Sequence, residues 1–134
     1  MRCIHLYFKT AFTLVAVLCA GTAIAADNAC LLRGSINESG VVQVVNYCAI
    51  NKGMSTANFR LHCQELHANH VEGLSPAAAR RLALQFTSTC PAVYKAACDS
   101  AFGQKMTLQF MAGDTLLADK TGALFCQSSG GRWR

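Results

Sequence analysis

The chain lacks the short motifs that mark common enzyme sites. It contains no GxSxG, no HExxH, no phosphate-loop glycine pattern and no CxxCH haem motif. Its seven Asp and Glu residues are spread singly along the 134 residues, so no neighbouring carboxylates indicate the acid and base of a glycosidase. These absences favour a protein that is not an enzyme. A small secreted hydrolase with an unidentified site is kept as a second alternative.

Charge is also sparse. Charged residues make up 14% of the chain, with 12 Lys and Arg against 7 Asp and Glu. The basic residues are scattered, whereas nucleic-acid binding calls for a clustered basic face. The sequence also shows no internal repeat and no long linker rich in proline, serine or glycine. We therefore expect one domain with no nucleic-acid partner.

Residues 1–26 have the three zones of a secretory signal peptide. Two basic residues lie near its start, residues 11–20 are almost continuously apolar, and Ala23-Ile24-Ala25 supplies the small residues that signal peptidase reads. The apolar run is shorter than the roughly 20 residues of a spanning helix. We expect this segment to be cleaved, which leaves 27–134 as a single small disulfide-rich domain. It would be periplasmic or extracellular, with no stable membrane span.

Cysteine is abundant in this chain. Two of the eight cysteines lie in the predicted signal peptide and would leave with it. The six that remain are Cys30, Cys48, Cys63, Cys90, Cys98 and Cys126. An even number in a short exported chain is typical of a disulfide framework, and the absence of any CxxC pair argues against a metal cluster. We expect three bridges, although spacing alone leaves all 15 pairings open.

Two segments have the composition of β-strands. Residues 41–48 (VVQVVNYC) are rich in β-branched and aromatic side chains and follow Gly40. Residues 105–111 (KMTLQFM) alternate apolar and polar side chains, which is the period of a half-buried strand. Both are expected in one antiparallel sheet.

Three helices are predicted in the middle of the chain. The first covers 57–70 and is capped by Ser55 or Thr56. A second begins at Ser75-Pro76 and continues through residue 86, and a shorter third begins at Pro91 and runs toward Cys98. The expected fold class is α+β, a small disulfide-stabilised domain in which a short antiparallel sheet is covered by two or three helices.

The segment 115–127 has two interpretations. As one helix capped by Asp114, it would hold Gly122 in its interior and would place Cys126 about 180° from Leu117. As a hairpin, it would place Gly122 in a turn at residues 119–122, where glycine is a favoured residue. The hairpin is preferred.

Three of the four histidines lie on the apolar stripe of the predicted helix 57–70. At 100° per residue, His62, His67 and His70 fall within an arc of about 140° that also holds Phe59 and Cys63. They either flank the buried face or bind zinc or copper, with His67 and His70 as the first ligands and His62 as a third. The prediction is no cofactor, with a periplasmic metal-binding protein as the alternative.

The C-terminal tail ends in Arg132-Trp133-Arg134. Trp133 either folds back onto the core or, together with Arg132, contacts a partner. Asn37 begins the tripeptide Asn-Glu-Ser, which is a glycosylation acceptor only in a host with that machinery. The function expected from the sequence is therefore a non-catalytic binding or interaction module. Its partner would be an unidentified protein or envelope component.

Overall fold

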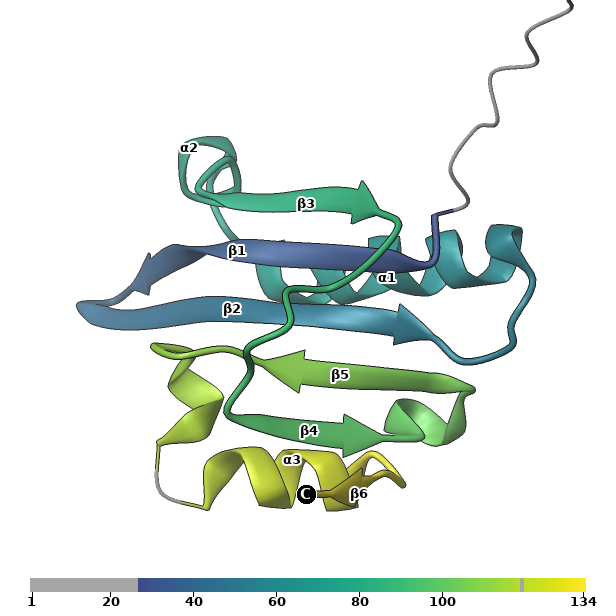
Figure 1. The fold of residues 1–134 in the computed structure, drawn as a ribbon. Helices are drawn as coiled ribbons and strands as arrows, with labels where there is room; N and C mark the ends of the chain where they lie inside the picture. Colours follow the sequence, from purple (N-terminus) through teal and green to yellow (C-terminus); the bar gives the residue numbers. More distant parts are fainter. Residues whose placement is uncertain (1–26, 119) are drawn as a thin grey trace, which may run out of the picture.

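A computed structural model describes residues 27–118 and 120–134, which form a six-stranded antiparallel sheet with three α-helices (Figure 1). The strands are β1 (Ala29–Glu38), β2 (Val41–Asn51), β3 (Leu82–Thr87), β4 (Ala96–Asp99), β5 (Met106–Phe110) and β6 (Arg132–Trp133). The helices are α1 (Thr56–Val71), α2 (Pro76–Ala79) and α3 (Thr121–Ser128), with the 3-10 turns η1 (Ala101–Gly103) and η2 (Thr115–Leu117). The strand order is β3-β1-β2-β5-β4-β6. The predicted signal peptide lies outside the described residues.

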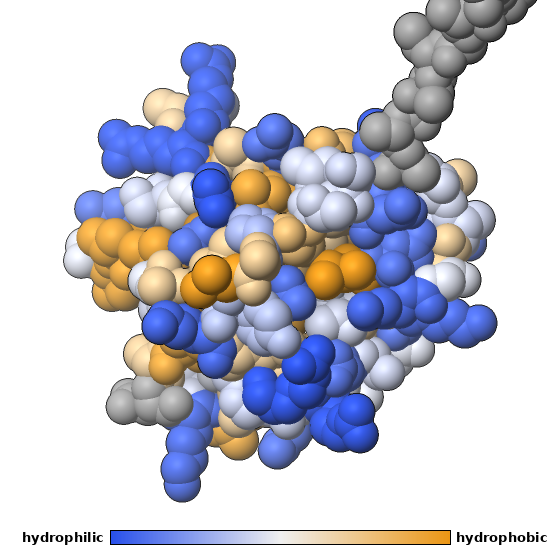
Figure 2. All heavy atoms as spheres, in the orientation of Figure 1, coloured by the Kyte–Doolittle hydropathy of each residue, from blue (hydrophilic) through white to orange (hydrophobic). Residues whose placement is uncertain are grey.

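The hairpin of β1 and β2 is the longest pairing in the sheet. Its turn is made by Ser39 and Gly40, whose φ angles of 51° and 84° are those of a tight hairpin turn. Asn37 is therefore in a strand, opposite Val42, and not in the turn. At this end of the hairpin Val41 and Val42 are 63% and 56% exposed, and Figure 2 shows apolar surface there. The predicted strand 41–48 is confirmed, and β2 pairs with β5, the other predicted strand.

The predicted helix 57–70 is confirmed as α1. The Ser55 side chain accepts a hydrogen bond from the backbone N–H of Asn58, as an N-cap does. Phe59, Cys63 and Leu66, spaced at three and four residues, are the buried residues of the helix. They join the core side chains of β1, β2 and β5 in one cluster.

The predicted helix from Pro76 through residue 86 is wrong beyond its first turn. Ser75 caps it as expected, but α2 ends at Ala79. Residues Leu82–Thr87 form β3, which pairs with β1 in an antiparallel register. The alternating residues Leu82, Leu84 and Phe86 all contribute to the core, which is the period of a strand.

Two further predictions are corrected. No helix begins at Pro91: residues 91–95 are irregular, and Ala96–Asp99 is a strand. The hairpin at 115–127 is also wrong, because η2 is followed by the helix α3. The C-terminal tail forms β6 on the edge of β4, and Arg134 exchanges two backbone hydrogen bonds with Ala97.

Three disulfides join Cys30 to Cys63, Cys48 to Cys90, and Cys98 to Cys126. The first links β1 to α1 and the third links β4 to α3, and both lie in the main core. The second lies on the other face of the sheet, where the connection between β3 and β4 crosses the strands (Figure 1). Ala29, Cys48 and Met111 form a second, smaller core there.

The prediction of a small disulfide-rich α+β fold with an antiparallel sheet is confirmed, as is the number of bridges. Within residues 27–118 and 120–134, no helix is long and apolar enough to cross a membrane. The three disulfides are consistent with an extracellular or periplasmic protein.

Candidate functional site

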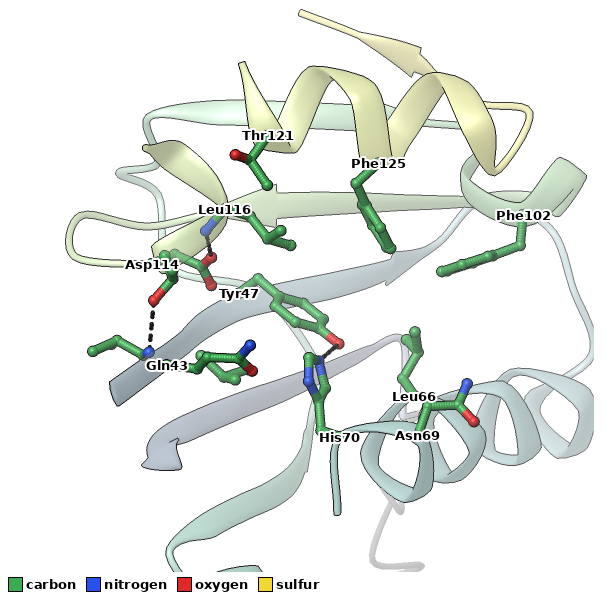
Figure 3. A pocket seen from close by; sticks show the side chains of 13 residues that line it. Gln43, Tyr47, Leu66, Asn69, His70, Phe102, Asp114, Leu116, Thr121 and Phe125 are labelled. Atoms are coloured by element: carbon green, nitrogen blue, oxygen red, sulfur yellow. Dashed lines mark hydrogen bonds between the residues drawn. The ribbon is translucent and has the colours of Figure 1, made fainter. Parts of the chain in front are cut away.

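A cavity of about 350 Å³ opens beside β2, between the C-terminal half of α1 and the segment from η2 to α3. We call it the β2 cavity (Figure 3). Its apolar lining comes from Val44, Val45, Tyr47, Leu66, Phe102, Leu116 and Phe125. Its polar lining comes from Gln43, Asn69, His70, Asp114, Thr115 and Thr121. No lysine or arginine of the described part of the chain belongs to this lining.

The edge of β2 beside the cavity is closed by side chains, because β5 pairs with β2 only from Tyr47 onward. The backbone N–H of Asn46 donates to Oδ2 of Asp114 at 2.6 Å, and that of Val44 donates to Oγ1 of Thr115 at 2.7 Å. The other carboxylate oxygen of Asp114, Oδ1, accepts from the backbone N–H of Leu116 at 2.8 Å. Asp114 thus caps η2 and fixes it to the strand.

Asp114 is a buried carboxylate, only 5% exposed. Burial raises its pKa above the ordinary value, while the two backbone hydrogen bonds and the nearby His70 act in the opposite direction. A carboxylate has about four acceptor positions on its two oxygens, and the backbone uses two of them. Asp114 therefore keeps acceptor capacity on both of its oxygens.

Tyr47 and His70 form a pair on the floor of the cavity. The Tyr47 hydroxyl lies 3.1 Å from Nε2 of His70, and the two share a hydrogen bond (Figure 3). Burial raises the pKa of the Tyr47 phenol, so the hydroxyl stays protonated. Burial also lowers the pKa of His70, which favours the neutral imidazole. The pair is thus polar but uncharged at neutral pH.

Two phenylalanines close the cavity opposite this pair. Phe125 comes from α3 and Phe102 from η1, and their rings meet edge to face with centroids 5.8 Å apart. Phe102 has a φ of 57°, a left-handed conformation that is costly for a bulky side chain. The residue is nevertheless 39% exposed, and its ring is turned toward the cavity (Figure 3). Backbone strain of this kind is often found at binding sites.

The three histidines of α1 have separate partners. Nδ1 of His62 donates to the Glu65 carboxylate at 3.0 Å, and Nε2 of His67 donates to the carbonyl oxygen of Leu82 at 3.0 Å. Nε2 of His70 is used by Tyr47. Over the described part of the chain, no three or more His, Cys, Asp or Glu side chains come together as a metal site. Each of the three histidines predicted as zinc or copper ligands thus has a hydrogen-bond partner of its own.

The C-terminal pair is divided between core and solvent. The Trp133 ring packs against the ring of Phe110, with centroids 5.4 Å apart. The Arg132 side chain is 83% exposed and lies 3.6 Å from the Asp99 carboxylate. Trp133 is therefore part of the fold, and Arg132 remains at the surface.

Sequence reasoning singled out only one residue of the β2 cavity as a site candidate, His70. The other members come from β2, η1, η2 and α3, which lie far apart in the sequence. One member of the cavity has a local sequence signal, because Asp114 stands at a position predicted to cap a helix. Nothing local indicated that its second oxygen reaches β2.

Comparisons of this chain with protein-family models, with curated proteins and with solved structures find no match. The function of the cavity is therefore inferred from its own chemistry.

Proposed function

We propose that this protein is an exported, non-catalytic binding module, and that its ligand is held in the β2 cavity between α1 and α3. The observation that carries the proposal is the cavity itself. Its volume of about 350 Å³ and its mainly apolar walls, with a few convergent polar groups, are those of a small-molecule site. Perturbed pKa values at Asp114 and His70 add to this, since such groups gather at functional sites.

The polar groups of the cavity favour binding over reaction. Nucleophilic catalysis needs a hydroxyl or thiol next to a base. Among the described residues the lining contains no serine or cysteine, and its hydroxyl groups are those of Tyr47, Thr115 and Thr121. The Tyr47 hydroxyl is hydrogen-bonded to His70, and the Thr115 hydroxyl accepts a hydrogen bond from β2. Asp114 and His70, the two candidate bases, hold backbone N–H groups and the Tyr47 hydroxyl. These groups are placed to orient a ligand.

Export is supported by two independent features. Residues 1–26 have the zones of a signal peptide, and three disulfides tie the domain together. Disulfides persist in oxidising compartments, so the ligand would be met in the periplasm or outside the cell. The ligand would then be a component of the envelope or of the medium.

The proposal is tested by blocking the cavity. Amide chemical shifts of residues 27–134 are recorded by NMR during titration with indole, a small neutral aromatic probe. Shifts are expected at Tyr47, His70 and Phe125. Thr121→Trp places a large ring at the exposed rim of the cavity and should abolish these shifts. Gln127→Trp adds the same ring at an exposed position of α3 outside the cavity and should leave them intact.

Two results would count against the proposal. One is the absence of any shift around the cavity at millimolar indole. The other is a response that the Thr121→Trp variant shows as strongly as the Gln127→Trp variant, which would place the probe elsewhere on the surface.

A further inference from the structure

The charge of the β2 cavity differs from that of the chain around it. The whole sequence has a net charge of +5, yet among residues 27–118 and 120–134 no lysine or arginine lines the cavity. Within these described residues its one carboxylate is Asp114, which is buried and has spare acceptor capacity on both oxygens. The other ionisable groups that the structure describes in the lining are Tyr47 and His70, both uncharged at neutral pH. An anionic ligand would therefore meet a carboxylate without any cation to pair with.

Three aromatic rings surround the same space. Tyr47 projects from β2, Phe125 from α3 and Phe102 from η1, and all three line the cavity (Figure 3). The face of an aromatic ring carries negative electrostatic potential and attracts a cation placed over it. Several rings around one position, with a carboxylate beside them, match a cation that is itself coated in apolar groups. Such a cation loses little hydration when it enters a mainly apolar site.

The geometry points to a small hydrophobic organic cation, an alkylammonium such as a trimethylammonium group, as the ligand of the β2 cavity. This inference rests on the proposed binding function and names its ligand class. The alkyl groups would contact Phe102, Phe125 and Leu116, and the positive charge would face Asp114. A primary ammonium or a metal ion fits less well, because neither offers apolar surface to the rings.

A pair of probes of equal shape isolates the charge. Choline carries a trimethylammonium group, and dimethylbutanol is its neutral isostere, with a tert-butyl group in its place. Both are titrated by NMR into the disulfide-bonded protein. Choline is expected to bind at least about tenfold more tightly than the isostere, since only choline gains from the rings and the carboxylate.

Variants assign that preference to the cavity. Asp114→Asn should bring the affinity for choline to within about twofold of that for the isostere. Because Asp114 also holds two backbone N–H groups, Phe125→Leu provides a second variant that keeps an apolar side chain. It should weaken choline about fivefold while changing the isostere by less than about twofold. Leu124→Ala, on an exposed neighbouring position of α3, is the control and should change neither affinity.

The outcomes separate this inference from the proposed function. Equal affinity for choline and the isostere, with both in the cavity, overturns the alkylammonium inference and leaves a small-molecule site. No binding of choline, of the isostere or of indole overturns both. Vesicles of phosphatidylcholine then distinguish the source of the cation. Co-sedimentation that choline competes away assigns a lipid headgroup, and choline binding without co-sedimentation assigns a free alkylammonium.

Discussion

Replacement of Gly122 by alanine tests how closely the C-terminal helix packs on the fold. Gly122 is buried in the first turn of α3. A Cβ atom placed on it would lie 2.5 Å from Cη2 of Trp133 and also within 3.0 Å of the carbonyl oxygen of Leu116. Neither neighbour moves easily, because one is backbone and the other is an indole packed on Phe110. The methyl group therefore has no room.

The expected magnitude comes from two opposing effects. Alanine gains up to about 1 kcal/mol over glycine inside a helix, and less near a helix end. Overpacking of a filled site costs about 1–3 kcal/mol, and the backbone contact with Leu116 favours the upper part of this range. We expect Gly122→Ala to lower the free energy of unfolding by about 2 kcal/mol. For a domain near 100 residues this is a fall in Tm of about 8 °C.

The assay is reversible thermal and urea unfolding followed by circular dichroism, with all disulfides intact. Gln127→Ala, at an exposed position of the same helix, is the control and should stay within about 0.5 kcal/mol of wild type. The double variant Gly122→Ala/Trp133→Leu should lose less than the sum of the two single changes, because the indole is one of the two clashing groups. A Gly122→Ala protein as stable as wild type, or additive behaviour of the pair, would refute the close packing inferred here.

Three further changes have expected outcomes. Replacing Cys48 and Cys90 by alanine opens a bridge with a sequence separation of 42 and should lower the free energy of unfolding by about 3–4 kcal/mol in urea; a loss below about 1 kcal/mol would contradict this. Because burial lowers the pKa of His70 from 6.5, the unfolded chain takes up the proton first as the pH drops below 6.5, and the stability of the wild type should fall. The free energy of unfolding, measured between pH 7.5 and 5, should depend less on pH in His70→Gln, and equal slopes for the two proteins would contradict this. Hydrogen bonds from Arg134 lower the pKa of Asp99, so ionised Asp99 stabilises the fold when the pH is above the ordinary pKa of 3.8. Acid unfolding should therefore begin at higher pH in Arg134→Gln, and an unchanged acid midpoint would contradict this role of Asp99.

The elements that the sequence predicted correctly are those with a complete local pattern. Helix α1 has a cap at Ser55 and buried residues at helical spacing. In β5 apolar and polar residue types alternate along the sequence, although the strand is more buried than the half-buried strand that this period predicts. The second helix failed because its start signal at Ser75 is real but governs only one turn. Beyond Ala79 the pairing of β3 with β1 decides the conformation, and a local sequence pattern contains no information about a distant partner strand.

The error at 115–127 has a different physical origin. A helix was rejected for this segment because Leu117 and Cys126 would face opposite ways on one continuous helix. The chain instead leaves helical geometry at Ala118 and starts again at Thr121, so the angle between those two residues has no meaning. Gly122 was assigned to a turn for its flexibility, whereas the structure uses its lack of a side chain.

The β2 cavity could not be predicted from local sequence patterns, because its residues come from distant segments of the chain. Tyr47 and His70 are 23 residues apart and meet only because α1 folds back along the sheet. Asp114 was identified as a cap, but its contact with Asn46 spans 68 positions. A cavity assembled from such distant segments leaves no periodicity in the sequence, since the strand order that creates it is itself long-range.

The pleat of the first hairpin has a consequence for oxidative folding. Cys30 and Cys48 are the first two cysteines of the domain in chain order, and they lie on adjacent strands, offset by one position in register. Neighbouring positions along a strand point to opposite faces, so the formed hairpin directs one thiol toward α1 and the other toward Cys90. The backbone of the sheet then stands between the two thiols. The β1–β2 hairpin is thus incompatible with a Cys30–Cys48 bridge, and it holds each thiol on the face of the sheet where its own partner lies.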